Sequence, residues 1–366
     1  MLENLSGSFK DPNEALTGDR AAFFKAVKTA AEKVQRLAEK TDELGLFMEK
    51  IQTVAYMPCS TGLRFFDNLL GGGVMQQSLV LLMAAPGTGK TTLAAQLGET
   101  MAEHGKPVIY FNFEMSREQM LAKALSAKLY RAGINMTALE ILQGYKWSGT
   151  QIEAMERILA QYRKENYPFI KYNPAGSSSE LSELLGFLRA TGEAAKASGR
   201  QAPAAIVDYL HLINSRSGLD NQELIKRAVT GLKQYAIDYD TFVIGIIASN
   251  RISNKDGRLT LESGRDSSNL EYTGDCVLSL NYAAIDSGKV KTDDLEAVAN
   301  LQQATRREMI IRVLKNRFGQ QGRSAQVLFD AGHNIFYGRE DRYQDDGWTL
   351  DDGSAAFKQK SPLVRY

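Results

Sequence analysis

A short glycine-rich segment has the residue types and the spacing needed to bind phosphate. Residues 84–92 read A-A-P-G-T-G-K-T-T, directly after the apolar run SLVLLM and directly before the helix-like run TLAAQLGETMAEH. Glycines let the backbone bend so that its N–H groups point at phosphate oxygens, and the start of the helix adds its positive dipole end. The segment therefore predicts a phosphate-binding loop, the P-loop. Its expected binding residues are Ala85, Pro86, Gly87, Thr88, Gly89, Lys90, Thr91 and Thr92.

The end of the P-loop predicts the cofactors. In this motif the lysine, here Lys90, reaches the β- and γ-phosphates, and the hydroxyl of the next residue, here Thr91, is a ligand of Mg²⁺. The first glycine of the usual G-x-x-x-x-G-K-[ST] pattern is replaced by Ala84, a mild departure. We therefore expect ATP and Mg²⁺ as cofactors and ATP hydrolysis as the reaction.

Two carboxylates follow apolar segments that read as strands. Asp208 ends the run AAIVD, and in an open α/β sheet the carboxyl end of a strand faces the ligand crevice. Asp208 is therefore expected to hold Mg²⁺, directly or through a water molecule. Glu114 ends VIYFNFE at the same edge and is a candidate general base for the attacking water. Its position alone fits an ordinary surface carboxylate equally well.

The alternation of apolar segments with helical patterns predicts an α/β fold. Up to Asp240, buried-type strands alternate with helices, which is typical of a mainly parallel twisted sheet with helices on both faces. The later strands leave no room for helices between them, so we expect an antiparallel C-terminal edge. The polar stretch Ile285–Thr305 reads as an exposed excursion. The expected strands are Ser78–Ala84, Val108–Phe113, Ala204–Asp208, Phe242–Ala248, Cys276–Asn281, Met309–Leu314 and Ala325–Phe329.

The chain is expected to have three parts: an N-terminal helical segment and linker over residues 1–57, an ATPase domain over 58–339 and a tail over 340–366. Apolar residues spaced by three and four predict a helix from about Asp19 to Ile51. The apolar stripe of this helix packs either on its own domain or on a neighbouring subunit. The tail, rich in Asp, Gly and Lys, reads as loose or as a strap that binds a partner.

Composition limits the class of protein. The 366 residues are 43% hydrophobic and 24% charged, with a net charge of +1, as in an ordinary globular protein. Near-neutrality argues against a protein that coats nucleic acid but allows a ring that threads it. No apolar run approaches the roughly 20 residues of a membrane helix, and the N-terminus lacks the pattern of a secretory signal. The two cysteines show no metal-ligand spacing, so we expect reduced thiols and a cytoplasmic location.

Several segments resemble the DnaB family of replicative helicases. They are VIYFNFEMSREQMLAKAL, AAIVDYLHLIN, ELIKRAVTGLKQYAIDYD leading into VIGIIASNR, ESGRDSSNLEYTGDCVLSL and IIRVLKNRFGQQGRSAQVLFD. The segment TGLRFFDNLLGGGV is similar to the start of the domain in the wider RecA superfamily, including RadA- and KaiC-like proteins. The resemblance covers roughly Cys59–Tyr337. It implies a RecA-like domain that assembles as a hexamer around single-stranded DNA, with ATP between subunits.

The resemblance also implies roles for single residues. Lys90 and Thr91 match the P-loop pair, Glu114 the catalytic glutamate and Asp208 the aspartate on the Mg²⁺ side. Lys315 and Arg317, in LKNRFG, match the basic pair that reaches the γ-phosphate of the neighbouring subunit. Without the resemblance these two cations read as a solvated strand end. A basic cluster and the ESG motif beside it are expected to contact DNA, although such clusters are usually solvated loops. These residues are Arg251, Lys255, Arg258, Glu262, Gly264 and Arg265.

Three departures from the family leave alternatives open. A Ser-Gln pair that follows a strand in the family is replaced by Ile247 and Ala248, and an arginine that contacts DNA is replaced by Leu261. The N-terminal part is reduced to about fifty-five residues, which makes a primase-bound role less expected. The leading hypothesis is a DnaB-like helicase or translocase with a loader or primase as partner. The alternatives are a RadA-like recombination or repair ATPase and a loading or regulatory module that binds ATP without translocating.

Overall fold

The computed structural model describes residues 18–40, 43–52, 57–216, 220–249, 257–263, 273–338, 348–350 and 357–359. The chain divides after Met57 into two units, Met1–Met57 and Pro58–Tyr366. The first unit contains helices α2 (Arg20–Lys40) and α3 (Glu43–Gln52) where the sequence predicted one helix. Helix α3 exposes large apolar side chains, among them Leu44 and Phe47.

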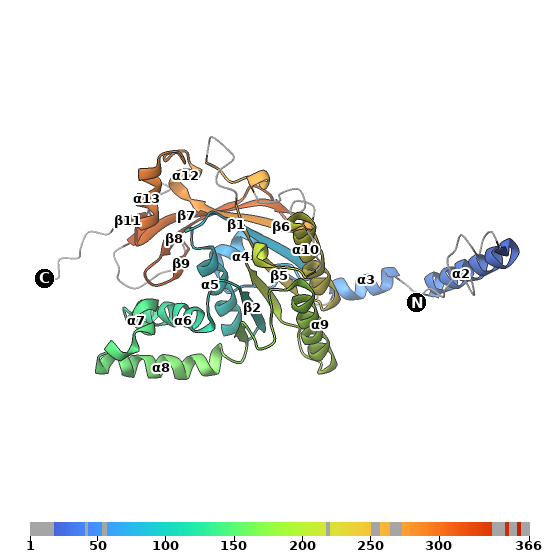
Figure 1. Ribbon diagram of the computed structural model, residues 1–366, viewed down its shortest axis with the longest axis horizontal. Coiled ribbons are helices and arrows are strands. Elements are labelled where there is room, and N and C mark those ends of the chain that lie inside the picture. The colour runs from blue at the N-terminus through green and yellow to red at the C-terminus, as the bar shows by residue number, and fades with distance from the viewer. Residues whose placement is uncertain are drawn as a thin grey trace. The chain divides into compact units, whose positions relative to one another are not determined.

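Among the described residues of the second unit, nine strands form one mixed sheet in the order β3-β2-β4-β5-β1-β6-β7-β8-β9 (Figure 1). The pairs from β3 to β6 are parallel, and the pairs from β6 to β9 are antiparallel. The predicted parallel sheet with an antiparallel C-terminal edge is therefore confirmed. The strands are β1 (Ser78–Ala84), β2 (Val108–Asn112), β3 (Ile170–Tyr172), β4 (Ala204–Asp208), β5 (Phe242–Ala248), β6 (Cys276–Tyr282), β7 (Arg306–Asn316), β8 (Ser324–Asp330) and β9 (Ile335–Tyr337).

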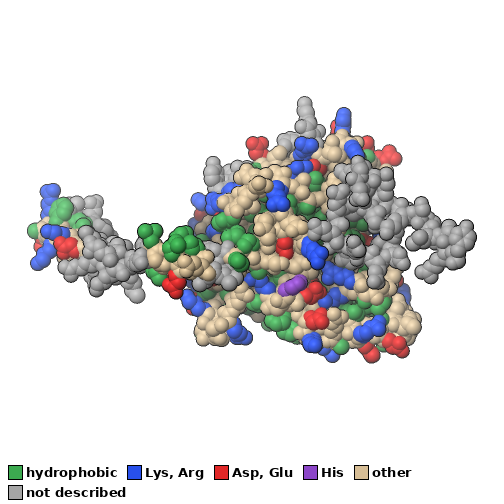
Figure 2. All heavy atoms as spheres, turned by 180° about the vertical axis from the view of Figure 1, so that it is seen from behind, with side chains coloured by type: hydrophobic (Ala, Val, Ile, Leu, Met, Phe, Trp, Pro, Cys, Tyr) green, Lys and Arg blue, Asp and Glu red, His purple; other side chains and the backbone are tan. Residues whose placement is uncertain are grey.

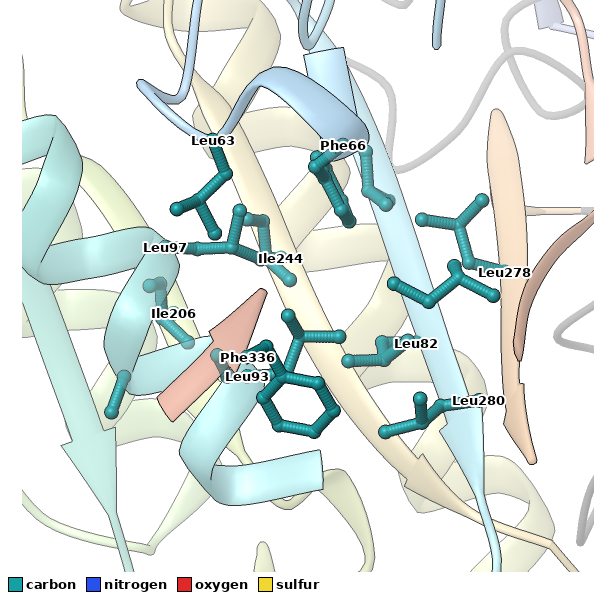
Figure 3. Close-up of a cluster of buried hydrophobic side chains, with 14 of the residues drawn as sticks. Leu63, Phe66, Leu82, Leu93, Leu97, Ile206, Ile244, Leu278, Leu280 and Phe336 are labelled. Carbon is teal, nitrogen blue, oxygen red and sulfur yellow. The ribbon is translucent and has the colours of Figure 1, made fainter. Parts of the chain in front are cut away.

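Helices cover both faces of the sheet. Strand β1 is buried throughout, and its alternate residues enter two separate cores. Leu82 belongs to the same core as Leu93 and Leu97 of α5, part of which Figure 3 shows, whereas Leu81 belongs to the core that contains side chains of α9 and α10. The main helices are α4 (Arg64–Leu70), α5 (Lys90–Glu103), α6 (Arg117–Arg131), α7 (Ala138–Leu142), α8 (Gly149–Glu165), α9 (Leu181–Ala197) and α10 (Asn221–Asp238).

The stretch predicted as an exposed excursion is largely exposed but helical. It folds into α12 (Ala283–Asp286) and α13 (Leu295–Gln303), beside β7 in Figure 1. Val298 and Leu301 of α13 pack against the core that contains α5, so this insertion is attached to the domain. In the tail, β10 (Trp348–Leu350) and β11 (Phe357–Gln359) pair as a small antiparallel sheet.

The surface matches the nearly balanced composition. On the face drawn in Figure 2, basic and acidic side chains are interspersed over the second unit. In the part of the chain that the structure describes, no helix is both long enough and apolar enough to cross a membrane.

Candidate active site

The predicted P-loop joins β1 to α5 at the carboxyl edge of the sheet. Strand β1 ends at Ala84 and α5 begins at Lys90, with Gly89 as its N-cap at φ +90°. A Cβ on Gly89 would lie 2.7 Å from the Phe329 ring and 3.0 Å from the Phe336 ring, so the packing of the antiparallel edge requires a glycine there. The hydroxyl of Thr88 donates a hydrogen bond to the carbonyl of Ala85 at 2.7 Å and closes the turn.

Two side chains from distant strands hold the carbonyl of Gly87. Tyr282, at the end of β6, donates its hydroxyl at 3.1 Å, and Arg307, near the start of β7, donates Nη1 at 2.8 Å. The Arg307 guanidinium also lies 5.4 Å from the centre of the Phe329 ring. These contacts fix the Gly87 carbonyl to β6 and β7. Tyr282 and Arg307 were not predicted, because neither residue belongs to a motif and both are far from the loop in sequence.

Asp208 occupies the end of β4, beside the end of β2, and is 1% exposed. Its Oδ2 accepts hydrogen bonds from the Tyr110 hydroxyl and the Asn112 amide, each at 3.0 Å. Its Oδ1 is also buried and accepts no well-aligned hydrogen bond from the described residues, although the Thr91 hydroxyl lies near enough to act on the carboxyl as a hydrogen-bond donor. Burial raises the pKa of the Asp208 carboxyl, while the neighbouring Thr91 and Tyr110 hydroxyls and the Lys90 charge act in the opposite direction. The bare oxygen leaves a place for a cation or its water beside the P-loop.

The structure brings Glu114 and Lys90 to the same place as Asp208. The charge of Glu114 contributes to raising the pKa of the Asp208 carboxyl, and that of Lys90 to lowering it, so both act on one carboxylate. Glu114 itself is exposed. The Lys90 ammonium lies 5.7 Å from the centre of the Tyr209 ring, and the peptide bond between Asp208 and Tyr209 is cis. Four predicted residues, counting Thr91, therefore meet at one edge of the sheet.

A second cation near the P-loop, Lys123 of α6, was missed. Its Nζ lies 3.4 Å from the hydroxyl of Thr92. Burial lowers the pKa of the Lys123 ammonium, and the charge of Asp208 partly restores it. In sequence, a lysine on an amphipathic helix reads as solvated, so only the packing of α6 against α5 reveals this position.

Lys315 and Arg317 lie at the opposite edge of the sheet from the P-loop. Lys315 donates Nζ to the carbonyl of Gly274 at 2.8 Å, and Arg317 forms an ion pair with Asp275 at 3.1 Å. Gly274 and Asp275 directly precede β6, which runs parallel to β1, whereas the P-loop follows the far end of β1. Seven residues of strand separate the two edges by about 20 Å. The structure does not bring this basic pair to the P-loop of its own chain.

Of the residues predicted to contact DNA, the structure describes Arg258 and Glu262, and both are exposed. Arg258 donates Nε to the carbonyl of Asp286 at 2.8 Å. Ile247 and Ala248 are the last two residues of β5, and Ala248 pairs with Ala84 at the end of β1, so the second of these two departures lies directly beside the P-loop. The remaining predicted residues, Arg251, Lys255, Gly264 and Arg265, lie outside the described residues.

A mainly parallel sheet, a P-loop after a central strand and an acidic residue at the tip of a nearby strand define a RecA-like P-loop fold. Within this class, the profile of the family described as DnaB-like helicase C terminal domain matches residues 59–337. The chain belongs to this family.

Matches to individual relatives differ in extent. The "Replicative DNA helicase DnaB" of Helicobacter pylori is 26% identical over 308 residues, which cover 82% of this chain and 58% of that protein. The "DNA repair protein RadA" of Campylobacter jejuni is 33% identical over 112 residues, which cover 29% of this chain and 25% of that protein. The chain thus matches a quarter to somewhat over half of the length of these relatives.

A solved structure supports the fold. A DnaB-like replicative helicase, described with its interactions with primase, superposes with a TM-score of 0.64 at 18% identity. The superposition covers 89% of this chain and 73% of that one.

Proposed function

We propose that this chain is the ATP-hydrolysing motor of a DnaB-like DNA helicase that works as a ring on single-stranded DNA. The observation that carries the proposal is the meeting of Lys90, Thr91, Asp208 and Glu114 at one sheet edge in a member of this family. The same edge in open α/β sheets is where ligands bind.

The residues present fit a Mg²⁺–ATP complex. Backbone N–H groups of the loop from Gly87 to the first turn of α5 would face the phosphates, and Lys90 would neutralise their charge. The Thr91 hydroxyl and the bare Oδ1 of Asp208 would hold Mg²⁺, the latter through a water molecule. When bound, Mg²⁺ neutralises charge on the phosphate oxygens.

Glu114 is proposed as the general base. Its exposed carboxylate accepts a proton from the water that attacks the γ-phosphorus, while the bond from that phosphorus to the ADP oxygen breaks. The Asn112 side chain accepts from the Glu114 N–H and donates to Asp208, so the two carboxylates belong to neighbouring strand ends, which supports this role.

The distance of Lys315 and Arg317 from the P-loop supports a ring. A cation that cannot reach the phosphates of its own chain can complete the site of a neighbour, and hydrolysis then depends on assembly. We propose a homo-hexamer with ATP at each interface, located in the cytoplasm and served by a loader or primase. The solved relative described with primase supports a partner of this kind.

DNA is proposed to pass along the loops that carry Arg258 and Glu262, together with Arg251, Lys255, Gly264 and Arg265. The RadA-like match favours recombination or repair as a second role for the same ATPase. Ala248 and Leu261 favour a module that binds ATP and a partner without translocating, because both replace polar family residues.

One experiment separates these functions. ATP turnover is measured with and without single-stranded DNA, and unwinding is followed on a forked duplex, with Lys90→Ala as the inactive control. A helicase is expected to show stimulation by DNA and unwinding, both lost in the control. Turnover stimulated by DNA without unwinding favours the RadA-like role. If the protein does not bind DNA at low salt in the presence of ATP, the remaining function is the partner-binding module.

A further inference from the structure

Asn112, the last residue of β2, connects the two carboxylates of the candidate site. Its side chain is 4% exposed and lies between Asp208 and the loop that carries Glu114. The amide nitrogen donates to Oδ2 of Asp208 at 3.0 Å. The amide oxygen accepts from the backbone N–H groups of Glu114 at 2.9 Å and Met115 at 2.6 Å.

We propose that Asn112 is a positioning residue that selects the oxygen of Asp208 facing the metal and sets the place of the Glu114 carboxylate. This inference rests on the proposed ATPase function and deepens it. Asn112 itself touches neither phosphate nor metal in this proposal, and it acts through its two neighbours.

The selection of the oxygen follows from the hydrogen bonds of Asp208. Two donors, the Tyr110 hydroxyl and the Asn112 amide, occupy Oδ2, whereas the buried Oδ1 accepts no well-aligned hydrogen bond in the described part of the chain and has the hydroxyl of the other proposed metal ligand, Thr91, nearby. A buried carboxylate oxygen without a partner is costly, so this oxygen is prepared for a group that arrives with the substrate. Groups that orient a metal ligand in this way typically change metal affinity by about 10- to 100-fold when they are removed.

The placement of Glu114 follows from its backbone. Within the described residues, no hydrogen bond or ion pair holds the Glu114 side chain, so its position depends on the turn between β2 and α6. The Asn112 oxygen gathers two N–H groups of that turn, and α6 then starts behind a capping box at Ser116. Asn173, directly after β3, supports the turn, because its side chain accepts from the Asn112 N–H at 2.7 Å and donates to the Met115 carbonyl at 3.2 Å.

An asparagine is suited to both tasks because its amide donates and accepts at once. Alanine removes both contacts. A serine hydroxyl still accepts from N–H groups two or three residues further on, but it is too short to reach Asp208 as well. Tyr110→Phe removes the other donor to Oδ2, together with a longer contact of 3.4 Å to the Thr91 carbonyl, and leaves the contacts of Asn112 with the Glu114 loop intact. The three variants therefore separate the contact of Asn112 with Asp208 from its contact with the Glu114 loop.

The test uses the full chain and three measurements. Binding of a fluorescent ADP in EDTA measures whether the P-loop still binds nucleotide. The Mn²⁺ concentration for half-maximal binding of the same probe measures the affinity of the metal ligands. The kcat at saturating metal measures the action of the base. Asn112→Ala is expected to keep metal-free binding, to need about tenfold more Mn²⁺ and to lose about tenfold or more in kcat. Asn112→Ser and Tyr110→Phe are expected to show the shift in Mn²⁺ with kcat within about threefold of wild type.

Two results would overturn the inference. An unchanged Mn²⁺ requirement in all three variants removes the role at Asp208, and a loss of metal-free ADP binding in Asn112→Ser shows that the residue only supports the fold. The proposed function fails separately, if wild-type protein binds no nucleotide and turns over no ATP. If Asn112→Ala does not fold, Asn112→Ser and Tyr110→Phe still decide the metal end, with thermal unfolding as the check of integrity.

Discussion

The separation of Arg317 from the P-loop can be tested by mixing two inactive variants. Arg317→Ala subunits lack the cation for the neighbour but keep the P-loop, whereas Lys90→Ala subunits lack the P-loop lysine but keep the cation. Arg317 is tied to Asp275 ahead of β6, and the P-loop lies about 20 Å away along β1. An arginine side chain spans far less than this distance, so no single chain can bring the two groups together.

The expected magnitudes follow from this geometry. Each variant alone should be nearly inactive, since loss of such a cation costs about 10³- to 10⁵-fold in rate. In an equimolar mixture with random assembly, about one interface in four pairs an intact P-loop with an intact Arg317, because the interface is heterologous and half of the subunits supply each side. About a quarter of wild-type turnover should return if the interfaces act independently, and less if hydrolysis is coupled around the ring.

The assay is steady-state ATP turnover across mixing ratios. Subunits are combined before nucleotide is added, and exchange is verified with two fluorescent labels and by particle size. Recovery should peak at equal amounts of the two variants. Activity at no ratio, with exchange demonstrated, would refute the action of Arg317 on a neighbour. A mixture of Lys90→Ala with inactive Glu114→Gln is the matched control, because both variants lack groups of the same half-site and no interface can be complete.

Three further predictions concern single positions. Glu114→Gln should bind ATP but lose about 10²- to 10⁴-fold in single-turnover hydrolysis, and a loss under twofold would dismiss Glu114 as the base. Arg258→Ala combined with Arg265→Ala should reduce the slope of log K against log salt for single-stranded DNA by about one to two units, whereas an unchanged slope would place DNA elsewhere. Gly89→Ala should lower the free energy of unfolding by about 1–3 kcal/mol, because the new Cβ clashes with Phe329. Gly87→Ala is the control, since its Cβ is 3.8 Å from the nearest atom at a similar positive φ, and equal losses in the two variants would assign the cost to φ alone.

The parallel part of the fold could be predicted because its signals are local. Strand β1, the P-loop and α5 are contiguous in sequence, and their patterns are read without knowledge of distant contacts. The three-residue strands β3 and β9 were missed, since a segment this short has no period. The length of β7 was also underestimated, because both of its polar ends pair with β6 or β8.

The motif residues of the candidate site were predicted, but the side chains that hold them in place were not. Asp208 and Glu114 could be placed because strand ends of a parallel sheet share one edge. Tyr282 and Arg307 contact Gly87 across 195 and 220 residues, and such contacts follow from strand order rather than from any local pattern. Asn112 was not predicted for a different reason. An asparagine at a strand end reads as a turn residue, and its contact with Asp208 depends on the register of β2 with β4.

Asp275 connects the amino end of strand β1 to Arg317. Its carboxylate accepts from the N–H of Leu79 at 2.8 Å and from Lys233 at 2.6 Å, while it holds Arg317. The amino end of β1 is thereby attached to the cation proposed to serve one neighbour, and its carboxyl end continues into the subunit's own P-loop. In a closed ring, each β1 would connect the nucleotide site of its own subunit to the site that its Arg317 completes on a neighbour. Rotation of a subunit during one hydrolysis event would then move both ends together, so that opening one site and closing the next become a single motion.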